Sequence, residues 1–566
     1  MSGDNRIKPR GIERRNLLKA GIAAPALFAA SSGQSAKADG VKANACDAAK
    51  TVETPSDLIV STDKGKVRGY ISSGIRTFKG VPYGAPTGGE NRFMPPKPPA
   101  PWSEVRDAFD YGAICPQEAP GPGGRFGFML RPSQGYADED CLNLNIWSPG
   151  LDGKKRAVMV WIHGGNYTTG SSYSLACQDG ESLARKGDVV VVSVNHRLNI
   201  LGHMDLAAIG ATDELSGSVN VGLLDLVRAL EWVRDNIEAF GGDPGNVTLF
   251  GQSGGGLKIA HLSGMPAAKG LFHKAISQSG SQVEPFDDAM TAPLAQNVME
   301  ELSLEEGDVA GLQAVPIDRL QAAAQKVLAD WRLTSGFADI WKTVGWAPRI
   351  EAKTLPYAPY SPEAGDVSRN IALMAGSARH EFSLAVFNPS AESMTMDELR
   401  ASLKSMYKDP DAVISVAQET YPEEKPVGLY SVISAAYFNR TNGIKQVQAK
   451  AALGGAPAFL YQFAWRTPVL DGTPKAYHCA ELPFVFANAE REPQATGGGA
   501  DALVIEEQVA GAWIAFAKTG NPSHAVLPDW VPVEPDTVPT MIFDTTPHLD
   551  ANTDQTLRDM VHAQRK

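Results

Sequence analysis

The stretch that decides the fold reads VTLFGQSGGG and occupies residues 247–256. Its first four residues are apolar or β-branched and predict a short buried strand. The next five fit Gly-x-Ser-x-Gly, a sharp turn that lifts a serine above the end of a sheet, with glycines where a Cβ would collide with nearby backbone. Ser253 is therefore the candidate nucleophile, although a Gly-rich turn that merely contains serine would fit the same five residues.

The segments before this turn alternate between apolar runs and a helical pattern. Residues 142–147, 157–162 and 189–195 predict strands, and the four valines at 189–192 suit a central strand covered on both faces. Residues 223–240 place apolar side chains at helical spacing and end at Gly-Gly-Asp-Pro. Strand, helix, strand in this order predicts a parallel crossover, so the fold class is α/β with a large, mostly parallel twisted sheet.

The later segments continue this alternation with longer helical stretches. Residues 371–375 and 458–464 predict further strands. Residues 287–331, 394–407 and 409–421 are helical and acidic, and we expect these insertions to cover the sheet edge and shape the mouth of a site.

Length and composition indicate one large globular domain. The chain has 566 residues, 43% of them hydrophobic and 20% charged, which suffices for a large core. Because no repeat, long charge run or low-complexity linker divides it, we expect a single domain over residues 58–566 after a loose arm at 39–57. The net charge of -12 argues against nucleic acid or an anionic membrane as the main partner.

The first 38 residues predict an export signal. An Arg14-Arg15 pair precedes an apolar run at 20–30 and a small-x-small site at Ala36 and Ala38. This order is typical of a twin-arginine signal peptide, so we expect the mature protein to be periplasmic or secreted from a bacterium. The apolar run is too short to span a bilayer, and no later run of apolar residues approaches eighteen.

A serine nucleophile needs a histidine base and a carboxylate that orients the histidine, in the order Ser, acid, His for this kind of fold. Glu381 follows the strand predicted at 371–375 and is the candidate acid. Four histidines lie beyond it: His478, His524, His548 and His562. His478 is preferred as the base because it follows a Gly/Pro loop beyond a strand, where the fold would present one.

The oxyanion donors are expected in an earlier loop. Residues 159–167 read MVWIHGGNY, a strand that runs into His-Gly-Gly, and this segment resembles the corresponding loop of lipases and esterases. Its backbone N–H groups would stabilise the negative charge that develops on a carbonyl oxygen under attack.

Motifs along nearly the whole chain resemble the type-B carboxylesterases, the group that includes cholinesterases and bacterial p-nitrobenzyl esterases. They include FKGVPY at 78–83, EDCLNLN at 139–145, FGGDP at 240–244 and GNP at 520–522. The resemblance implies an α/β-hydrolase fold with a catalytic triad of Ser253, Glu381 and His478. It also implies oxyanion N–H donors at Gly165, Asn166 and Gly254, and a disulfide between Cys115 and Cys141.

Four residues depart from the family pattern. Gln252 stands where Glu is common, which removes a negative charge that would raise the pKa of His478. Gly254 replaces Ala, and Asn166 replaces a third glycine, which is tolerable if that position needs a positive φ. The Asn166 side chain puts acceptance of very bulky alcohol groups in doubt. His196 replaces Tyr and is interpreted as structural.

The remaining cysteines and any cofactor site are less defined. Five is an odd number of cysteines, so at least one thiol stays free or bonds elsewhere. Cys177 and Cys479 are either small buried residues or a second disulfide, and nothing assigns a partner to Cys46. No Cys or His cluster has the spacing of metal ligands, and no cofactor is implied.

The sequence therefore predicts a serine hydrolase of small carboxylic esters. An amidase, carbamate hydrolase or thioesterase with the same triad remains an alternative, because leaving-group preference depends on pocket shape. A non-catalytic, cholinesterase-like binding domain is the alternative from another class. The sequence does not define the oligomeric state.

Overall fold

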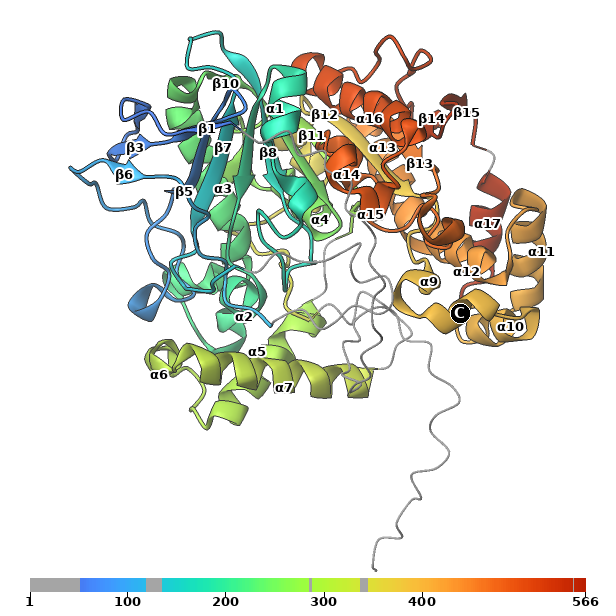
Figure 1. The fold of residues 1–566 in the computed structure, drawn as a ribbon. Coiled ribbons are helices and arrows are strands. Elements are labelled where there is room, and N and C mark those ends of the chain that lie inside the picture. The colour runs from blue at the N-terminus through green and yellow to red at the C-terminus, as the bar shows by residue number, and fades with distance from the viewer. Residues whose placement is uncertain (1–50, 119–134, 285–287, 336–344, 553) are drawn as a thin grey trace, which may run out of the picture.

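A twelve-stranded sheet runs through the molecule, with helices on both faces (Figure 1). The computed structural model describes residues 51–566 except 119–134, 285–287, 336–344 and 553. In spatial order the strands are β1 (Val52–Glu53), β4 (Tyr70–Ser72), β5 (Ile75–Pro82), β7 (Asn143–Ser148), β9 (Val190–Val194), β8 (Arg156–Ile162), β10 (Gly242–Gln252), β11 (Lys274–Gln278), β12 (Ala372–Ala378), β13 (Ala458–Phe463), β14 (Thr540–Phe543) and β15 (His548–Asp550).

The middle of this sheet is parallel. Every neighbouring pair from β9 to β14 is parallel, whereas the pairs on the β1 side and the final β14–β15 pair are antiparallel. A small separate sheet consists of β2 (Ile59–Ser61), β3 (Lys66–Arg68) and β6 (Arg106–Asp107). The α/β class and the large, mostly parallel sheet are confirmed.

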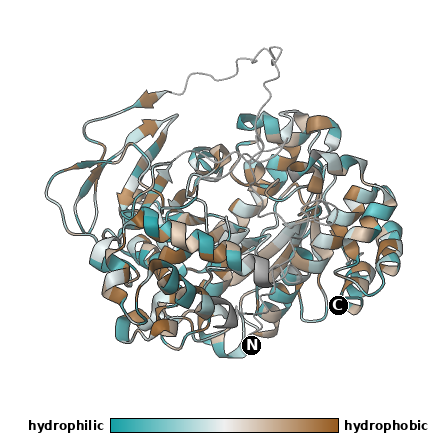
Figure 2. Ribbon diagram, turned by 90° about the horizontal axis from the view of Figure 1, so that it is seen from below, coloured by the Kyte–Doolittle hydropathy of each residue, from teal (hydrophilic) through white to brown (hydrophobic). Residues whose placement is uncertain are grey.

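The helices cover the sheet and form two groups at its margins. Around the sheet lie α1 (Glu181–Gly187), α2 (Asn199–His203), α3 (Val221–Asn236), α4 (Gly254–Leu262), α8 (Gly365–Ser368), α13 (Thr441–Ala452), α14 (Leu482–Val485), α15 (Pro493–Thr496) and α16 (Ala500–Thr519). The marginal groups are α5 (Asp288–Leu302), α6 (Val309–Ala314) and α7 (Ile317–Ser335), and α9 (Leu384–Phe387), α10 (Met396–Leu403), α11 (Pro410–Thr420), α12 (Pro426–Ala435) and α17 (Gln555–Ala563). Many ribbons alternate brown and teal (Figure 2), as amphipathic helices do.

The valine run illustrates why the central strands are apolar on both faces. Val190 and Val192 pack in one hydrophobic cluster, and Val189 and Val191 pack in the other. Successive side chains of a strand point to opposite faces, so a strand between two helical layers needs apolar residues at every position. This is the arrangement that the sequence predicts.

The N-terminal arm differs from expectation at its end. Val52 and Glu53 form β1 and pair with β4, so strand pairing begins before residue 58. Two backbone pairings at the sheet edge suffice for this, although both side chains are exposed. The predicted signal peptide and Cys46 lie outside the described residues. No helix among the described residues combines the length and the hydropathy needed to cross a membrane.

Candidate active site

Ser253 occupies a strained turn between β10 and α4. Its backbone has φ 55° and ψ -123°, a conformation that a side chain tolerates only where the surrounding structure enforces it. The Ser253 N–H donates to the Gln278 carbonyl oxygen at 2.7 Å, which fastens the turn to the end of β11. A Cβ on Gly251 would lie 2.6 Å from the Ile162 carbonyl oxygen, and one on Gly255 would lie closer still. The flanking glycines therefore have the steric cause that the sequence predicts.

The predicted oxyanion loop, which carries Gly165 and Asn166, lies directly against this turn. Gly165 has φ 89° and Asn166 has φ 53°, so the position of Asn166 does need a positive φ. A Cβ on Gly254 would lie 2.5 Å from both N and Cα of Asn166, so these two backbones are in contact. No acceptor among the described residues takes the N–H groups of Gly165, Asn166 or Gly254. Three donors from two distant segments are thus available to a ligand oxygen.

Glu381 and His478 are joined by a hydrogen bond. Glu381 follows β12 and His478 follows β13, and the imidazole Nδ1–H donates to Glu381 Oε2. The Ala378 N–H donates to Glu381 Oε1 at 2.9 Å, and the His478 N–H donates to the Glu381 carbonyl oxygen at 3.2 Å. The Glu381 side chain is fully buried. This carboxylate therefore fixes both the orientation and the tautomer of the imidazole.

The electrostatic surroundings favour the charged form of His478. Burial lowers the pKa of the imidazole, but the charge and hydrogen bond of Glu381, with the charge of Glu481, outweigh it and hold the pKa above 6.5. Such a base becomes available for proton uptake as the pH rises through that value.

The Gln252 amide packs over the imidazole instead of pointing at one nitrogen. Its Nε2 lies 3.1 Å from His478 Nε2 and 3.4 Å from Nδ1, and a group aligned with one nitrogen's lone pair would be much farther from the other. The Cys479 thiol donates to Gln252 Oε1 at 3.2 Å and orients the amide. No hydrogen bond joins Ser253 Oγ to His478 among the described residues. The lone pair of His478 Nε2 therefore remains accessible. A hydrogen bond between a catalytic serine and its base often forms only when substrate binds.

Comparisons with known proteins identify the family of this chain. The model of the carboxylesterase family matches residues 56–561. The chain belongs to the carboxylesterase family. It is 36% identical over 490 residues to the para-nitrobenzyl esterase of Bacillus subtilis, covering 86% of this chain and 95% of the relative. It is 35% identical to the phenmedipham hydrolase of Pseudarthrobacter oxydans, covering 83% of this chain and 92% of the relative.

Solved structures give the same result. An esterase from Clostridium hathewayi, described as able to hydrolyse aliphatic aromatic polyesters, has a TM-score of 0.78 at 36% identity. That match covers 91% of this chain and 100% of the other. This carboxylesterase is thus an α/β-hydrolase and a serine carboxylic-ester hydrolase, as its sequence predicts.

Three residues near the site were not singled out as functional from sequence. Glu481 is fully buried beside the triad, and burial together with the charge of Glu381 raises its pKa to about 7. Phe382 lies parallel to the His478 ring at 6.4 Å between centroids. Lys258 is fully buried on α4. Only Glu481 and Phe382 carried a signal, because each lies within three residues of a predicted triad member.

The four cysteines in the described part of this carboxylesterase are free thiols. The expected Cys115–Cys141 disulfide is not formed, but the two buried side chains share a hydrogen bond that, with burial, raises the pKa of the Cys141 thiol well above its usual value. Cys177 and Cys479 are also free, and Cys479 bonds Gln252 instead. His196 is buried with its ring 4.6 Å from that of His163, in keeping with a structural role.

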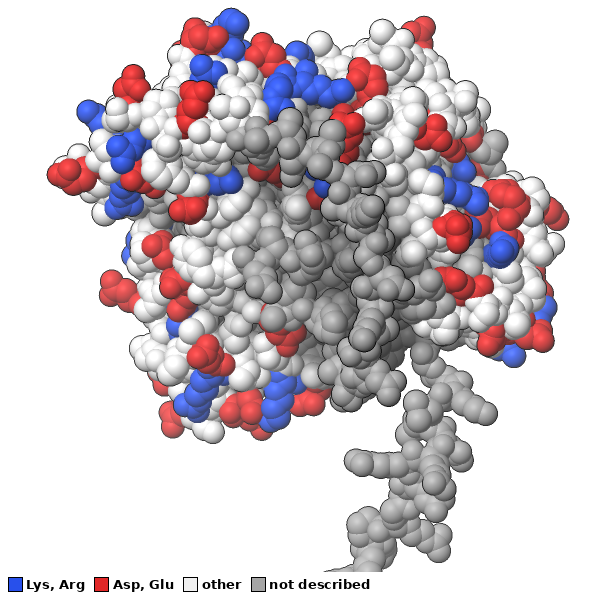
Figure 3. Space-filling model, in the orientation of Figure 1, with Lys and Arg blue, Asp and Glu red and all other residues white. Residues whose placement is uncertain are grey.

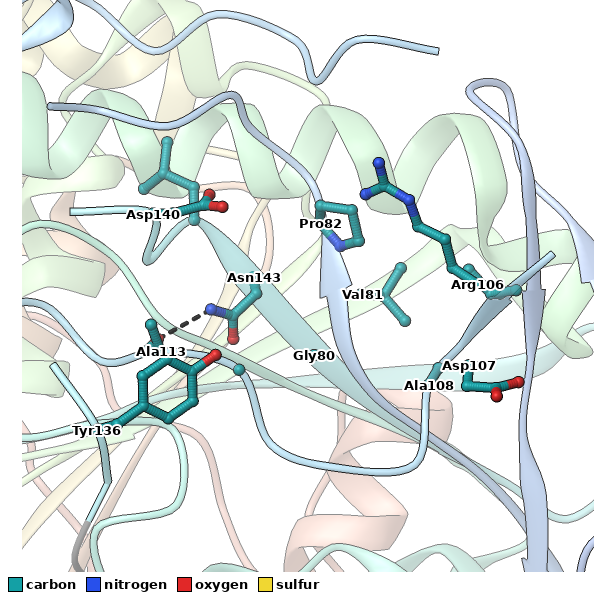
Figure 4. A pocket seen from close by; sticks show the side chains of 13 residues that line it. Gly80, Val81, Pro82, Arg106, Asp107, Ala108, Ala113, Tyr136, Asp140 and Asn143 are labelled. Atoms are coloured by element: carbon teal, nitrogen blue, oxygen red, sulfur yellow. Dashed lines mark hydrogen bonds between the residues drawn. The ribbon is translucent and has the colours of Figure 1, made fainter. Parts of the chain in front are cut away.

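A small hollow elsewhere contains none of the predicted site residues (Figure 4). It measures about 160 Å³ and lies beside β5, β6 and the start of β7, with Arg106, Asp140 and Asn143 among its lining. Asn143 is already hydrogen-bonded to the Ala113 carbonyl oxygen at 2.9 Å.

On the face of the molecule shown in Figure 3, acidic and basic side chains are interspersed, so the net negative charge does not form one continuous patch there.

Proposed function

We propose that this carboxylesterase cleaves esters through an acyl-enzyme on Ser253, with His478 as base and Glu381 as its orienting carboxylate. The observation that carries the proposal is the Glu381–His478 hydrogen bond, formed beside the Ser253 turn with Gln252 in contact with the imidazole. The three segments come from the ends of parallel strands β10, β12 and β13, which lie at one edge of the sheet.

The steps follow from these positions. His478 Nε2 takes the proton of Ser253 Oγ as the oxygen bonds to the ester carbonyl carbon, and the carbonyl oxygen becomes an oxyanion. The N–H groups of Gly165, Asn166 and Gly254 donate to that oxyanion. The imidazolium then gives its proton to the leaving alcohol. In the second half, His478 takes a proton from water, the hydroxide attacks the acyl carbon, and Ser253 leaves with the proton.

The side of the site next to His478 favours an apolar or aromatic substituent. The Phe382 ring lies parallel to the His478 imidazole on one side of it. The Phe438 ring meets the Phe382 ring edge-on, with 6.4 Å between the two centroids. Phe438 lies in the π-helical turn Ala436–Arg440, a rare conformation found often at functional sites. Both rings are half-buried, so part of each remains available to a ligand. Aromatic groups bury well against such edges.

The test of the mechanism is Ser253→Ala assayed with p-nitrophenyl butyrate. We expect a loss of more than about 10³-fold in kcat, because a triad without its nucleophile retains only residual catalysis. Ser263→Ala is the matched control, since its buried hydroxyl bonds the Ile259 carbonyl oxygen at the other end of α4. A fluorophosphonate should label Ser253 in the wild type alone. Equal turnover by Ser253→Ala would overturn the assignment.

The test of the aromatic substituent compares kcat/KM for benzyl acetate and methyl acetate. Phe438→Ala should lower the ratio of the two values about ten-fold, mainly through the benzyl ester, because the loss is one of apolar contact. An unchanged ratio would place the aromatic group elsewhere.

We also propose that the protein is exported by the twin-arginine route. The Arg14-Arg15 pair, apolar run and cleavage site precede the family match, which begins at residue 56. Changing both arginines to lysine should leave activity in the cytoplasmic fraction. Mature protein still exported by the double variant would contradict this route.

A further inference from the structure

A fully buried lysine lies beneath the oxyanion loop. Lys258 is on α4, one helical turn after Gly254, and its side chain has no exposed surface. Lys258 Nζ donates to the His163 carbonyl oxygen at 3.2 Å and lies 5.9 Å from the centre of the Tyr167 ring. His163 and Tyr167 stand at the two ends of the segment that carries Gly165 and Asn166. The ammonium thus contacts both ends of the loop that supplies two of the three proposed donors.

The described part of the chain offers this charge no carboxylate partner. No acidic side chain of the described residues forms an ion pair with Lys258, and burial lowers its pKa to about 7. An isolated buried ammonium is costly, so a core position that served packing alone would favour an apolar residue. The presence of lysine here points to a role for its charge or its hydrogen bond.

The histidines and the tyrosine around Lys258 are uncharged near neutral pH. Burial, which dominates, lowers the pKa of His163 and His196 well below 6.5, and that of His203 and His261 to about 3 and 4. Burial raises the pKa of Tyr167, and the nearby Arg197 is paired with Asp225 at 2.6 Å. The groups that face or neighbour Lys258 are therefore His163, Tyr167, His196, His203, His261, Cys115 and the Arg197–Asp225 pair.

We infer that Lys258 is a positioning residue for ester hydrolysis, which holds the oxyanion loop at both ends and places an ammonium charge against the backbone that carries the donors. The inference rests on the oxyanion loop proposed above. A positive charge in a water-poor interior stabilises an oxyanion that appears only in the transition state. Its effect is therefore on kcat and not on KM.

The same arrangement predicts an alkaline limb in the pH profile of kcat, that is, a fall in kcat at high pH. The active form carries the proton on Lys258, and this form is lost as the pH rises through about 7. His478 must be unprotonated, which sets the acidic limb. We expect kcat of the wild type to pass through a maximum and decline on the alkaline side.

The experiment measures kcat and KM against pH, from 5 to 9, for the wild type and three variants. Lys258→Met should lower the maximal kcat by roughly 10- to 100-fold with little change in KM, and should remove the alkaline limb. Lys258→Arg, which stays charged, should recover most of the rate and also lack that limb. Lys450→Met is the matched control, because Lys450 is equally buried and bonds the Arg369 carbonyl oxygen at 3.1 Å on α13. It should keep both limbs.

Two results would overturn the inference. One is a Lys258→Met protein with the wild-type kcat and the wild-type alkaline limb. The other is a wild-type kcat that stays level from pH 7 to 9, which needs no variant and decides the matter even if Lys258→Met fails to fold. Full activity of Ser253→Ala is a different outcome and would overturn the proposed function itself.

Discussion

The two halves of the active site are held by different forces. The serine half, made of the Ser253 turn and the oxyanion loop, is fixed by backbone contacts between Gly251, Gly254 and Gly255 and the ends of β8 and its loop. The histidine half is fixed by side chains, namely the Glu381 carboxylate and the Gln252 amide around the imidazole.

This difference predicts how each half responds to change. Backbone contacts are steric, so apart from the effect inferred for Lys258 the serine half should be sensitive chiefly to a single added methyl group. The histidine half contains two buried carboxyl groups and an imidazole, so it should be sensitive to charge and pH. Each prediction below tests one side of this contrast.

The largest expected effect is on the histidine half. Glu381→Gln should lower kcat about 10³- to 10⁴-fold, because the amide can present a donor to Nδ1 and stabilise the wrong tautomer. Steady-state kinetics with p-nitrophenyl butyrate, alongside circular dichroism to confirm folding, measures this. A variant with the full rate would show that another carboxylate orients His478, and Glu481 would be tested next.

A methyl group should be almost as damaging on the serine half. Gly254→Ala places a Cβ against the backbone of Asn166, so the oxyanion loop must shift and kcat should fall about 10²- to 10³-fold. Gly443→Ala, where the nearest atom is 3.8 Å away, is the control. Combining Gly254→Ala with Asn166→Gly frees the loop backbone and should recover part of the rate. No loss in the single variant would contradict the steric account.

A charge introduced beside the imidazole should move the pH profile without removing activity. Gln252→Glu places a carboxylate against His478, which raises the pKa of the imidazole further. The acidic limb of kcat/KM should shift upward by about one pH unit. A limb that stays in place would mean that the residue 252 side chain turns away from the ring in the working enzyme.

The smallest effect concerns stability. Between pH 4.5 and about 7 the folded protein keeps a proton on Glu481 that the unfolded chain releases. The contribution of this carboxyl to the free energy of unfolding is therefore fully present below pH 4.5 and declines as the pH rises to about 7. Glu481→Gln should flatten this decline in urea unfolding, whereas Glu507→Gln, at an exposed position on α16, is the control. An unchanged slope would show that Glu481 ionises normally.

The sequence predicted the serine half better than the histidine half. A strand, a turn and a helix are local, so VTLFGQSGGG made Ser253 the candidate nucleophile, although its partners elsewhere in the chain were needed to prefer it over a Gly-rich turn. For Asn166 the family pattern gave a condition, a positive φ, and the structure meets that condition. Glu381 and His478 came from their positions after strands and from a family resemblance. The structure contains the expected hydrogen bond between Glu381 and His478. Their roles as orienting carboxylate and base stay predictions.

Contacts between distant segments could not be predicted from the sequence. Nothing in the local pattern tells that the Gln252 amide covers His478, or that Lys258 reaches the His163 carbonyl oxygen 95 positions away. The pairing of Val52 and Glu53 with β4 was missed for a related reason, because two polar-flanked residues carry no strand periodicity. In each case the deciding interaction depends on packing that a one-dimensional pattern does not record.

The order of strands in the sheet also has a consequence for synthesis of the chain. Ser253 follows β10, Glu381 follows β12 and His478 follows β13, and these strands pair in parallel across long intervening segments. Parallel pairings between remote segments form late, since loop-closure entropy opposes them. A ribosome-bound chain that has emerged only through α4 would hold the serine turn but no base. With the triad proposed above, the enzyme gains reactivity only after most of its length has been made and folded.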